Sequence, residues 1–437
     1  MQITLRTVNR TDKNQPIKAS LIKFPYKLVK TDHYALLFGD TAIHNRTVMR
    51  STLPTEQKAR AIIVDVIRGF SLVGVLIANF TSYVNQQTPE HILNSISSSL
   101  DTSLMTINAV FLEWKFMTLF SILFGYGFGL ILESLEKKNI NPNSFFIRRM
   151  FWLFIFGCIH TLFWWADVLH LYAISGIILL IFRKESNRSI LFFAVLFMFI
   201  IPLMVSYALR NQPETFTDGD IQLLYNQYKQ GNIIDVFKMN ISFYYRMFII
   251  SGRDLHDIIE ILGRFLFGYF LLRIKLFHSV ETKKALFKKV LLFTSPMMVT
   301  YVIIRWLLLK EVFHPNQFYI SPIFSLGILS TTCFYVSLLV IAYISFGMNK
   351  FFAALQALGR MTLTNYLLIS TFLIILLYGI GFGKLGELPI HTIWLFSLAW
   401  LIFEIQFSTY WLKHFRYGPA EWIWRQLTYG KQLQLRK

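Results

Sequence analysis

The feature that most constrains this chain is the recurrence of apolar runs long enough to cross a lipid bilayer. A helix needs about 20 mostly apolar residues to span the hydrocarbon core, where lipid offers the backbone no hydrogen-bond partners. The sequence therefore predicts an all-α, polytopic integral membrane helical bundle with about ten transmembrane helices. The predicted spans are 66–84, 108–132, 147–165, 168–183, 189–209, 255–274, 288–308, 321–347, 363–381 and 389–412.

Composition agrees with a membrane protein. The 437 residues are 54% hydrophobic, include 43 Phe, and are only 15% charged, whereas soluble domains carry roughly 25% charged residues. The formal charge of +19 is spread between the apolar runs and is not gathered on one polar domain. Basic residues in such positions hold loops beside anionic lipid, so we expect the bilayer as a partner and no nucleic acid.

The distribution of basic residues predicts the orientation. Short cytoplasmic loops of membrane proteins carry an excess of Lys and Arg. Five alternate connections (133–149, 183–188, 273–289, 346–360 and 412–437) hold 21 such residues, whereas the other five hold 5. The first set is therefore predicted to face the cytoplasm. With an even number of spans in the plasma (inner) membrane, both termini are expected on the cytoplasmic side.

The chain divides into three predicted parts. Residues 1–59 form a basic cytoplasmic arm, 60–412 the transmembrane domain, and 413–437 an amphipathic cytoplasmic tail in which Glu421 and Arg425 are spaced as one helical turn. The arm has two interpretations. It lies on the membrane surface, or translation normally begins at Met49 and residues 1–48 are absent from the native protein.

Polar residues inside the spans carry most of the functional information, because a charge in the membrane is expensive unless it pairs or lines a cavity. Asp65 and Arg68 lie three residues apart in the first span, with Asn79 deeper. They form either a structural ion pair or a site for a charged headgroup. Lys115, about 10 Å into the second span, either snorkels to the surface or contacts substrate.

The end of the third span holds the strongest candidate for chemistry. His160 and Trp164 are four residues apart, and Asp167 follows near the outer boundary. An imidazole exchanges a proton near neutral pH, and a nearby carboxylate holds its tautomer and stabilises its charged form. We expect His160 and Asp167 to act together at a water-accessible cavity, although packing is the structural alternative.

Other motifs give weaker signals. Cys158 and Cys333 lie in apolar runs, so neither a disulfide framework nor a cysteine metal site is expected. His256, Asp257, Glu260 and Arg264 have helical spacing, but that spacing alone is weak for a metal. No metal and no bound cofactor are predicted. The alternating glycines Gly125, Gly127 and Gly129 follow no strand, so they indicate close helix packing and no phosphate loop.

Several blocks together resemble a known family. They are Asp65–Phe70 with Asn79, Lys115–Phe116 with Phe120–Gly125, Arg148–Arg149 with Gly157, His160, Trp164, Asp167, Leu169, Tyr172 and Ala173, then Gly359–Leu367, and Phe415–Arg425. On these residues the chain resembles the YeiB-like bacterial membrane proteins, catalogued as domain of unknown function 418. The resemblance covers about residues 60–430. The family's usual glycine before the aspartate is Ala166 here.

The family is distantly similar to membrane acyltransferases, which implies a function. We expect transfer of an acyl group from cytoplasmic acyl-CoA, as co-substrate, to a sugar or envelope acceptor, with His160 as base and Asp167 as its orienting group. The resemblance and the polar pattern nominate one substrate-binding set: Asp65, Arg68, Asn79, Lys115, Trp164, Asn365 and Tyr366. A secondary transporter of a small solute and a non-catalytic scaffold or sensor are the alternatives, and the oligomeric state is not predicted.

Overall fold

The computed structural model describes residues 62–208, 217–312 and 317–437, so the predicted basic arm 1–59 lies outside the described residues. The described residues belong to one unit, Pro54–Lys437. Within them the structure is helical, and the only bridge of β type joins Phe415 to Arg436. The helices are α2 (Ile62–Asn85), α3 (Glu90–Ile96), α4 (Ser99–Ile107), η2 (Asn108–Leu112), α5 (Lys115–Glu136), α6 (Pro142–Phe163), α7 (Leu169–Leu179), η3 (Leu180–Lys184), α8 (Asn187–Val195), η4 (Leu196–Ile200), α9 (Ile201–Ala208), α10 (Asp218–Gln230), α11 (Ile233–Tyr244), η5 (Tyr245–Ile250), α12 (Arg253–Arg273), η6 (Val280–Lys283), α13 (Lys284–Leu309), α14 (Gln317–Phe346), α15 (Lys350–Arg360), α16 (Thr362–Leu377), α17 (Ile390–His414) and α18 (Pro419–Tyr429).

The predicted class of an all-α membrane protein is confirmed. Seven helical segments of the described chain are long and apolar enough to cross a membrane, and α15 with α16, which meet at 82°, make up to eight. The seven segments are Ile62–Asn85, Ser99–Glu136, Pro142–Phe163, Asn187–Ala208, Val280–Leu309, Ile323–Phe346 and Ile390–His414. Each overlaps a predicted span, whereas the count of ten stays a prediction.

Three predicted spans do not form such helices by themselves. Helix α7 has 11 residues and α16 has 16, both below the length needed to cross the hydrocarbon core. Helix α12 has 21 residues but carries Asp257, Glu260 and Arg264 along its first half. Helix α6 ends at Phe163 and α7 begins at Leu169, so the third and fourth predicted spans form a tight hairpin around Asp167.

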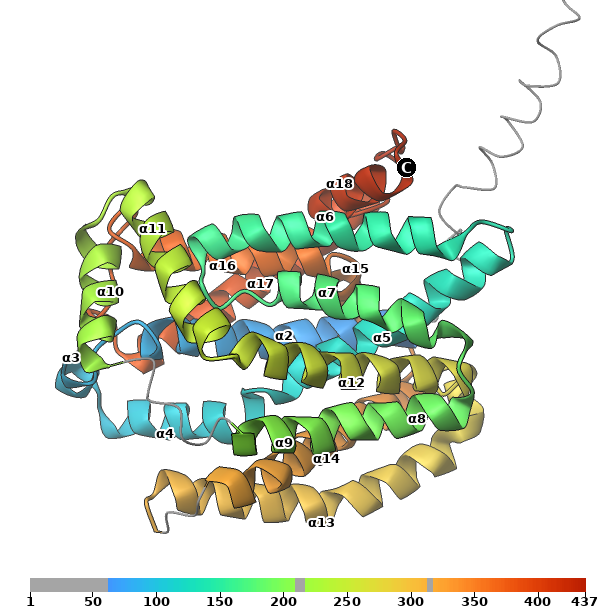
Figure 1. The fold of residues 1–437 in the computed structure, drawn as a ribbon, viewed down its shortest axis with the longest axis horizontal. Coiled ribbons are helices and arrows are strands. Elements are labelled where there is room, and N and C mark those ends of the chain that lie inside the picture. Colours follow the sequence, from blue (N-terminus) through green and yellow to red (C-terminus); the bar gives the residue numbers. More distant parts are fainter. Residues whose placement is uncertain (1–61, 209–216, 313–316) are drawn as a thin grey trace, which may run out of the picture. The chain divides into compact units, whose positions relative to one another are not determined.

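Alternate connections gather at opposite ends of the bundle, whereas which end faces the cytoplasm stays a prediction. Figure 1 shows the α5–α6, α7–α8 and α12–α13 connections at one end, and α3 and α10 at the opposite end. The α16–α17 loop joins α10, because Gly379 donates its N–H to the Tyr228 carbonyl at 2.8 Å and Lys229 pairs with Glu387 at 2.7 Å. Hydrogen bonds from Lys229 and Lys384 lower the pKa of Glu387 to about 2.

Helices α5 and α12 cross with their backbones almost in contact. A Cβ added to Gly125 would lie 1.9 Å from the Phe265 carbonyl oxygen, and one added to Gly268 would lie 1.8 Å from that of Ile122. Only glycine permits such an approach, which matches the small-residue packing of membrane helices. The packing role predicted for Gly125 is therefore confirmed, and the crossing fixes α12 against α5.

The C-terminal helix α18 is tied to the broken pair α15–α16. Because the chain bends sharply before α16, its first N–H groups have no partners within that helix. The Glu421 carboxylate of α18 accepts the N–H of Leu363 at 2.6 Å, the N–H of Thr364 at 3.1 Å and the Thr364 hydroxyl at 2.5 Å. Burial raises the pKa of the Glu421 carboxyl, and these hydrogen bonds oppose that rise.

This geometry makes the structural role of Glu421 testable. Glu421→Ala leaves the N–H groups of Leu363 and Thr364 without their acceptor, so we expect the free energy of unfolding to fall by about 2 kcal/mol. Thermal unfolding in detergent measures the loss, and Gln432→Ala on the exposed end of the same tail should change nothing. If Glu421→Ala abolished activity while expression and thermal stability stayed intact, the structural role would be wrong.

Candidate functional site

The turn between α6 and α7 places the candidate residues. Helix α6 ends where Trp164 adopts an extended backbone, and Asp167 accepts the N–H of Leu169 at 2.8 Å, which satisfies one free donor at the start of α7. The two helices pack closely, as shown by the 2.4 Å that would separate a Cβ on Gly157 from the backbone nitrogen of His170. The hairpin therefore holds His160, Asp167 and His170 in one layer.

Asp167 is the centre of a buried hydrogen-bond network. The residue is 2% exposed. Its Oδ1 lies 2.7 Å from Nδ1 of His160 and accepts the Tyr366 hydroxyl at 3.1 Å. Its Oδ2 lies 3.3 Å from Nδ1 of His170 and accepts the Leu169 N–H. Four groups that can donate converge on two oxygens, which is the full acceptor capacity of an ionised carboxylate.

His160 has the arrangement of an oriented base. Because an ionised carboxylate only accepts hydrogen bonds, Nδ1 of His160 is the donor to Asp167, and in the neutral tautomer Nε2 is then an acceptor. The residue is 6% exposed, and Nε2 has no hydrogen-bond partner among the described residues. A buried polar atom left in this way is unusual in a folded protein. It is therefore the atom through which this site can contact a substrate.

The structure brings four of the predicted site residues together. His160, Asp167 and Tyr366 are in contact, and the rings of His160 and Tyr366 have centroids 5.3 Å apart. Trp164 is buried beside them, where it stacks on Tyr83 of α2 with centroids 3.6 Å apart. This stacking attaches the α6–α7 turn to α2. The predicted pairing of His160 with Asp167 is thus present in the fold.

The other predicted residues lie in separate contacts. Arg68 pairs with Asp65 at 3.2 Å, as the spacing predicted. Asn79 is half-buried on α2. Asn365 donates to the Ser408 hydroxyl of α17 at 2.9 Å, although its neighbour Tyr366 reaches Asp167. Their part in substrate binding stays a prediction.

Lys115 corrects one sequence-based alternative. Snorkelling to the surface is wrong, because Lys115 is 0% exposed. The helix breaks after η2, where Trp114 has φ of 68°, and Lys115 reaches back across the break to the Ala109 carbonyl. The Lys115 ammonium donates to that carbonyl at 2.8 Å and lies 4.9 Å from the Tyr301 ring centre. The lysine thus stabilises the break between η2 and α5.

Three residues of the network had not been assigned to the site. His170 contacts Asp167 on one side, and on the other its Nε2 lies 2.8 Å from the Tyr244 hydroxyl. The Tyr244 hydroxyl in turn donates to Asp254 at the start of α12. The spacing of His170, three residues after Asp167, is a signal that could have found it. Tyr244 and Asp254 carry no such local signal.

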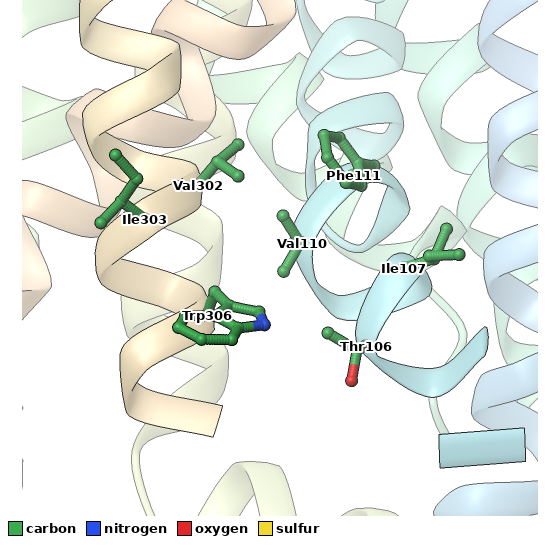
Figure 2. A pocket seen from close by; sticks show the side chains of 7 residues that line it. All are labelled: Thr106, Ile107, Val110, Phe111, Val302, Ile303 and Trp306. Carbon is green, nitrogen blue, oxygen red and sulfur yellow. The ribbon is translucent and has the colours of Figure 1, made fainter. Parts of the chain in front are cut away.

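Two further features lie outside this network. His256, Asp257 and Glu260 place ligand atoms within 4.8 Å of one another. Arg253 and Arg264 pair with the two carboxylates at 3.8 Å and 2.5 Å, so the group is already neutralised. Figure 2 shows an apolar pocket between α13 and the α4–η2 segment, and it has no charged lining residue with which to do acid–base chemistry. Its lining residues are Thr106, Ile107, Val110, Phe111, Val302, Ile303 and Trp306.

The fold and the site define a polytopic helical membrane protein with a buried centre of two histidines around one aspartate. Comparisons with known proteins agree with the motifs. Residues 271–431 match the family described as protein of unknown function (DUF418). The chain is 26% identical over 402 residues to the uncharacterized protein YxaH of Bacillus subtilis (strain 168), covering 87% of this chain and 97% of the relative.

Two further relatives extend the match. The chain is 27% identical over 374 residues to the uncharacterized 39.9 kDa protein in the amylase 3′ region of Bacillus acidopullulyticus, with 85% and 94% covered. It is 25% identical over 396 residues to the uncharacterized protein YeiB of Escherichia coli (strain K12), with 84% and 96% covered. No solved structure matches. The chain is YeiB-like, and the resemblance indicated by its motifs is confirmed.

Proposed function

We propose that this protein is a transmembrane acyltransferase that moves an acyl group from cytoplasmic acyl-CoA to a hydroxyl or amine of a sugar or envelope acceptor. The observation that supports it is the buried Nε2 of His160, which has no hydrogen-bond partner among the described residues and whose ring is held by Asp167 through Nδ1. A histidine oriented by a carboxylate in this way is the usual general base of acyl transfer.

The reaction needs one base that later acts as an acid. Nε2 of His160 takes the proton of the acceptor hydroxyl while the oxygen of that hydroxyl attacks the thioester carbonyl. The tetrahedral intermediate then collapses, the carbon–sulfur bond breaks, and His160 returns the proton to the thiolate. Asp167 stabilises the imidazolium formed in between, and Tyr366 helps to hold Asp167 in place.

The donor would arrive at the basic end of the bundle. Arg68, Arg148 and Arg149 belong to the side on which the Lys and Arg residues concentrate, and cations there suit the coenzyme A phosphates. His160 lies about 27 Å along α6 from Pro142, at about 1.5 Å per residue. The proposal therefore requires the pantetheine arm to carry the acyl group through the bundle to His160.

The orientation that this route assumes is part of the proposal. In a variant lacking Cys158 and Cys333, an impermeant thiol reagent applied to intact cells should modify Asn226→Cys, in the segment 210–240, and spare Lys284→Cys. The expectation follows from the low positive charge of the first loop and the high charge of the second. Permeabilised cells give the control, since both positions should then react. The reverse pattern in intact cells would place both termini outside.

The experiment that tests the chemistry uses purified protein in lipid nanodiscs. We expect labelled acetyl-CoA to lose its acetyl group to water or to an added sugar or amine acceptor, at a rate well above that of His160→Ala. If the natural protein released acetyl no faster than His160→Ala and carried a proton-driven solute flux in proteoliposomes, transport would replace the proposed acyl transfer. Absence of both would favour a scaffold.

Secondary transport is the second candidate, because one observation favours it. Glu404 of α17 is buried, accepts the Trp400 indole N–H at 3.1 Å through Oε1, and has no described partner for Oε2. Buried carboxyl groups inside membrane bundles commonly take part in proton relays. If Glu404→Gln abolished a proton-coupled flux and left acetyl transfer absent in both proteins, this candidate would be supported.

A further inference from the structure

A second arm of hydrogen bonds begins at Oδ2 of Asp167, the carboxylate oxygen that His160 does not contact. It runs from Asp167 to Nδ1 of His170, from Nε2 of His170 to the Tyr244 hydroxyl at 2.8 Å, and from there to Oδ2 of Asp254. The four residues come from the α6–α7 turn, α7, the end of α11 and the start of α12. Asp254 Oδ1 has no hydrogen-bond partner in the described part of the chain.

Counting protons along this arm leaves two arrangements. Asp167 accepts hydrogen bonds from three other groups and, as an ionised carboxylate, has no proton to donate, so Nδ1 of His170 must carry the proton that lies between them. If Tyr244 donates to Asp254, its oxygen accepts from Nε2–H, and His170 is a charged imidazolium beside an ionised Asp254. If Asp254 is protonated and donates to Tyr244, the tyrosine donates to Nε2, and His170 is neutral.

The two arrangements contain the same number of protons and the same heavy-atom contacts. They interconvert when the Nε2 proton moves to the Tyr244 oxygen while the Tyr244 proton moves to Asp254. No bond between heavy atoms breaks, and no other reactant is required. The hydrogen-bonded geometry is that of a short proton path through one hydroxyl group.

We infer that His170, Tyr244 and Asp254 form a proton relay that shifts one positive charge away from Asp167 when His160 becomes protonated. In this role the inference rests on the proposed function. When His160 takes the acceptor proton, two imidazolium rings would face one carboxylate. Transfer of the His170 proton to Asp254 keeps the charge around Asp167 constant, and its return accompanies release of the thiol. These three are therefore positioning residues, because they act through Asp167.

Other titratable and charged groups act on the same arm. The electrostatic effects of Arg253 and Asp257 of α12 on Asp254 have opposite signs, because the guanidinium stabilises the ionised carboxylate and the second carboxylate destabilises it. Cys158 of α6 and Asp167 both disfavour ionisation of the Tyr244 hydroxyl. Tyr366 of α16 and His160 meet the arm at Asp167 itself. The two neighbours of Asp254 on α12 have opposite charges and oppose each other, whereas the hydrogen bonds through Tyr244 and His170 link Asp254 to the centre of the site.

The first test does not require turnover. Infrared pH-difference spectra of the full chain in nanodiscs follow protonation of the Asp254 carboxyl, identified by its loss in Asp254→Asn. We expect His170→Gln to move its midpoint by about one pH unit or more, because the two groups share a proton. In a Tyr244→Phe background that shift should fall by roughly half or more. If the pH midpoint of Asp254 protonation were unchanged in His170→Gln, the relay would be wrong.

The second test measures acetyl transfer in mixtures of H₂O and D₂O. We expect Tyr244→Phe to lower the rate by roughly tenfold or more. The rate of the natural protein should depend on the deuterium fraction with a curve, since several protons move together, whereas Tyr244→Phe should give a line. Tyr245→Phe, the same change at the exposed neighbour, is the control. If Tyr244→Phe and Tyr245→Phe gave the same curved dependence on the deuterium fraction, the relay would be wrong. If the infrared spectra showed coupling but no acetyl transfer occurred, the relay would stand and the proposed function would be wrong.

Discussion

Replacing His160 by alanine should eliminate acyl transfer, with a loss of roughly 10² to 10⁴ in rate, while folded protein is retained. The expected loss is large because Nε2 of His160 is the buried acceptor without a described partner, and water would replace it poorly as a base. Asp167→Asn should cause a comparable loss, because an amide cannot accept the hydrogen bonds that converge on two carboxylate oxygens.

The double variant distinguishes chemistry from packing. Groups that act as one unit are non-additive, so His160→Ala with Asp167→Asn should be no slower than either single change. The measurements are the rate of labelled acetyl transfer and the thermal midpoint of each purified protein. His414→Ala, an exposed histidine at the end of α17, should leave both unchanged. If the losses appear in thermal stability and not in the rate per folded molecule, His160 and Asp167 only pack.

Sequence reasoning found this pair because its signal is local. His160 and Asp167 lie seven residues apart, and a single turn between two helices brings them together at 2.7 Å. Tyr366 is 199 residues from Asp167, and it was nominated as a polar residue inside a span and through a motif that resembles a family, neither of which predicts its contact with Asp167. Tyr244 is 74 residues from His170 and belongs to no such motif, so nothing in the chain predicts their contact.

The predicted spans show a similar limit. Apolar length identified α2, α6 and α17 well, because a long apolar run has few alternatives in water or lipid. It could not anticipate the break at Trp114, where a left-handed residue separates η2 from α5. That break is why Lys115 faces the Ala109 carbonyl and is buried. Hydropathy measures the length of a run and carries no information about where a helix breaks inside it.

The helix crossings give the second large effect, and it concerns folding. Gly125→Ala should prevent normal assembly of α5 with α12, because the added Cβ would lie 1.9 Å from the Phe265 carbonyl oxygen. That oxygen belongs to the backbone of a packed helix and cannot move aside by rotation. Overpacking in a well-packed core costs about 1–3 kcal/mol and occasionally more. A contact with rigid backbone places this substitution at the upper end of that range.

Gly127→Ala, two residues along the same helix, is the matched control. Its added Cβ would lie 2.7 Å from the end of the Arg68 guanidinium, a flexible group that can shift. Alanine also favours the helical state over glycine by about 1 kcal/mol, which offsets a small displacement of that side chain. Size-exclusion profiles and thermal midpoints of the two purified variants should therefore diverge, with Gly125→Ala aggregated or poorly recovered and Gly127→Ala close to the natural protein. Equal behaviour of the two variants would mean that the α5–α12 crossing does not depend on backbone contact, and the placement of α12, and with it of Asp254 near Tyr244, would need another cause.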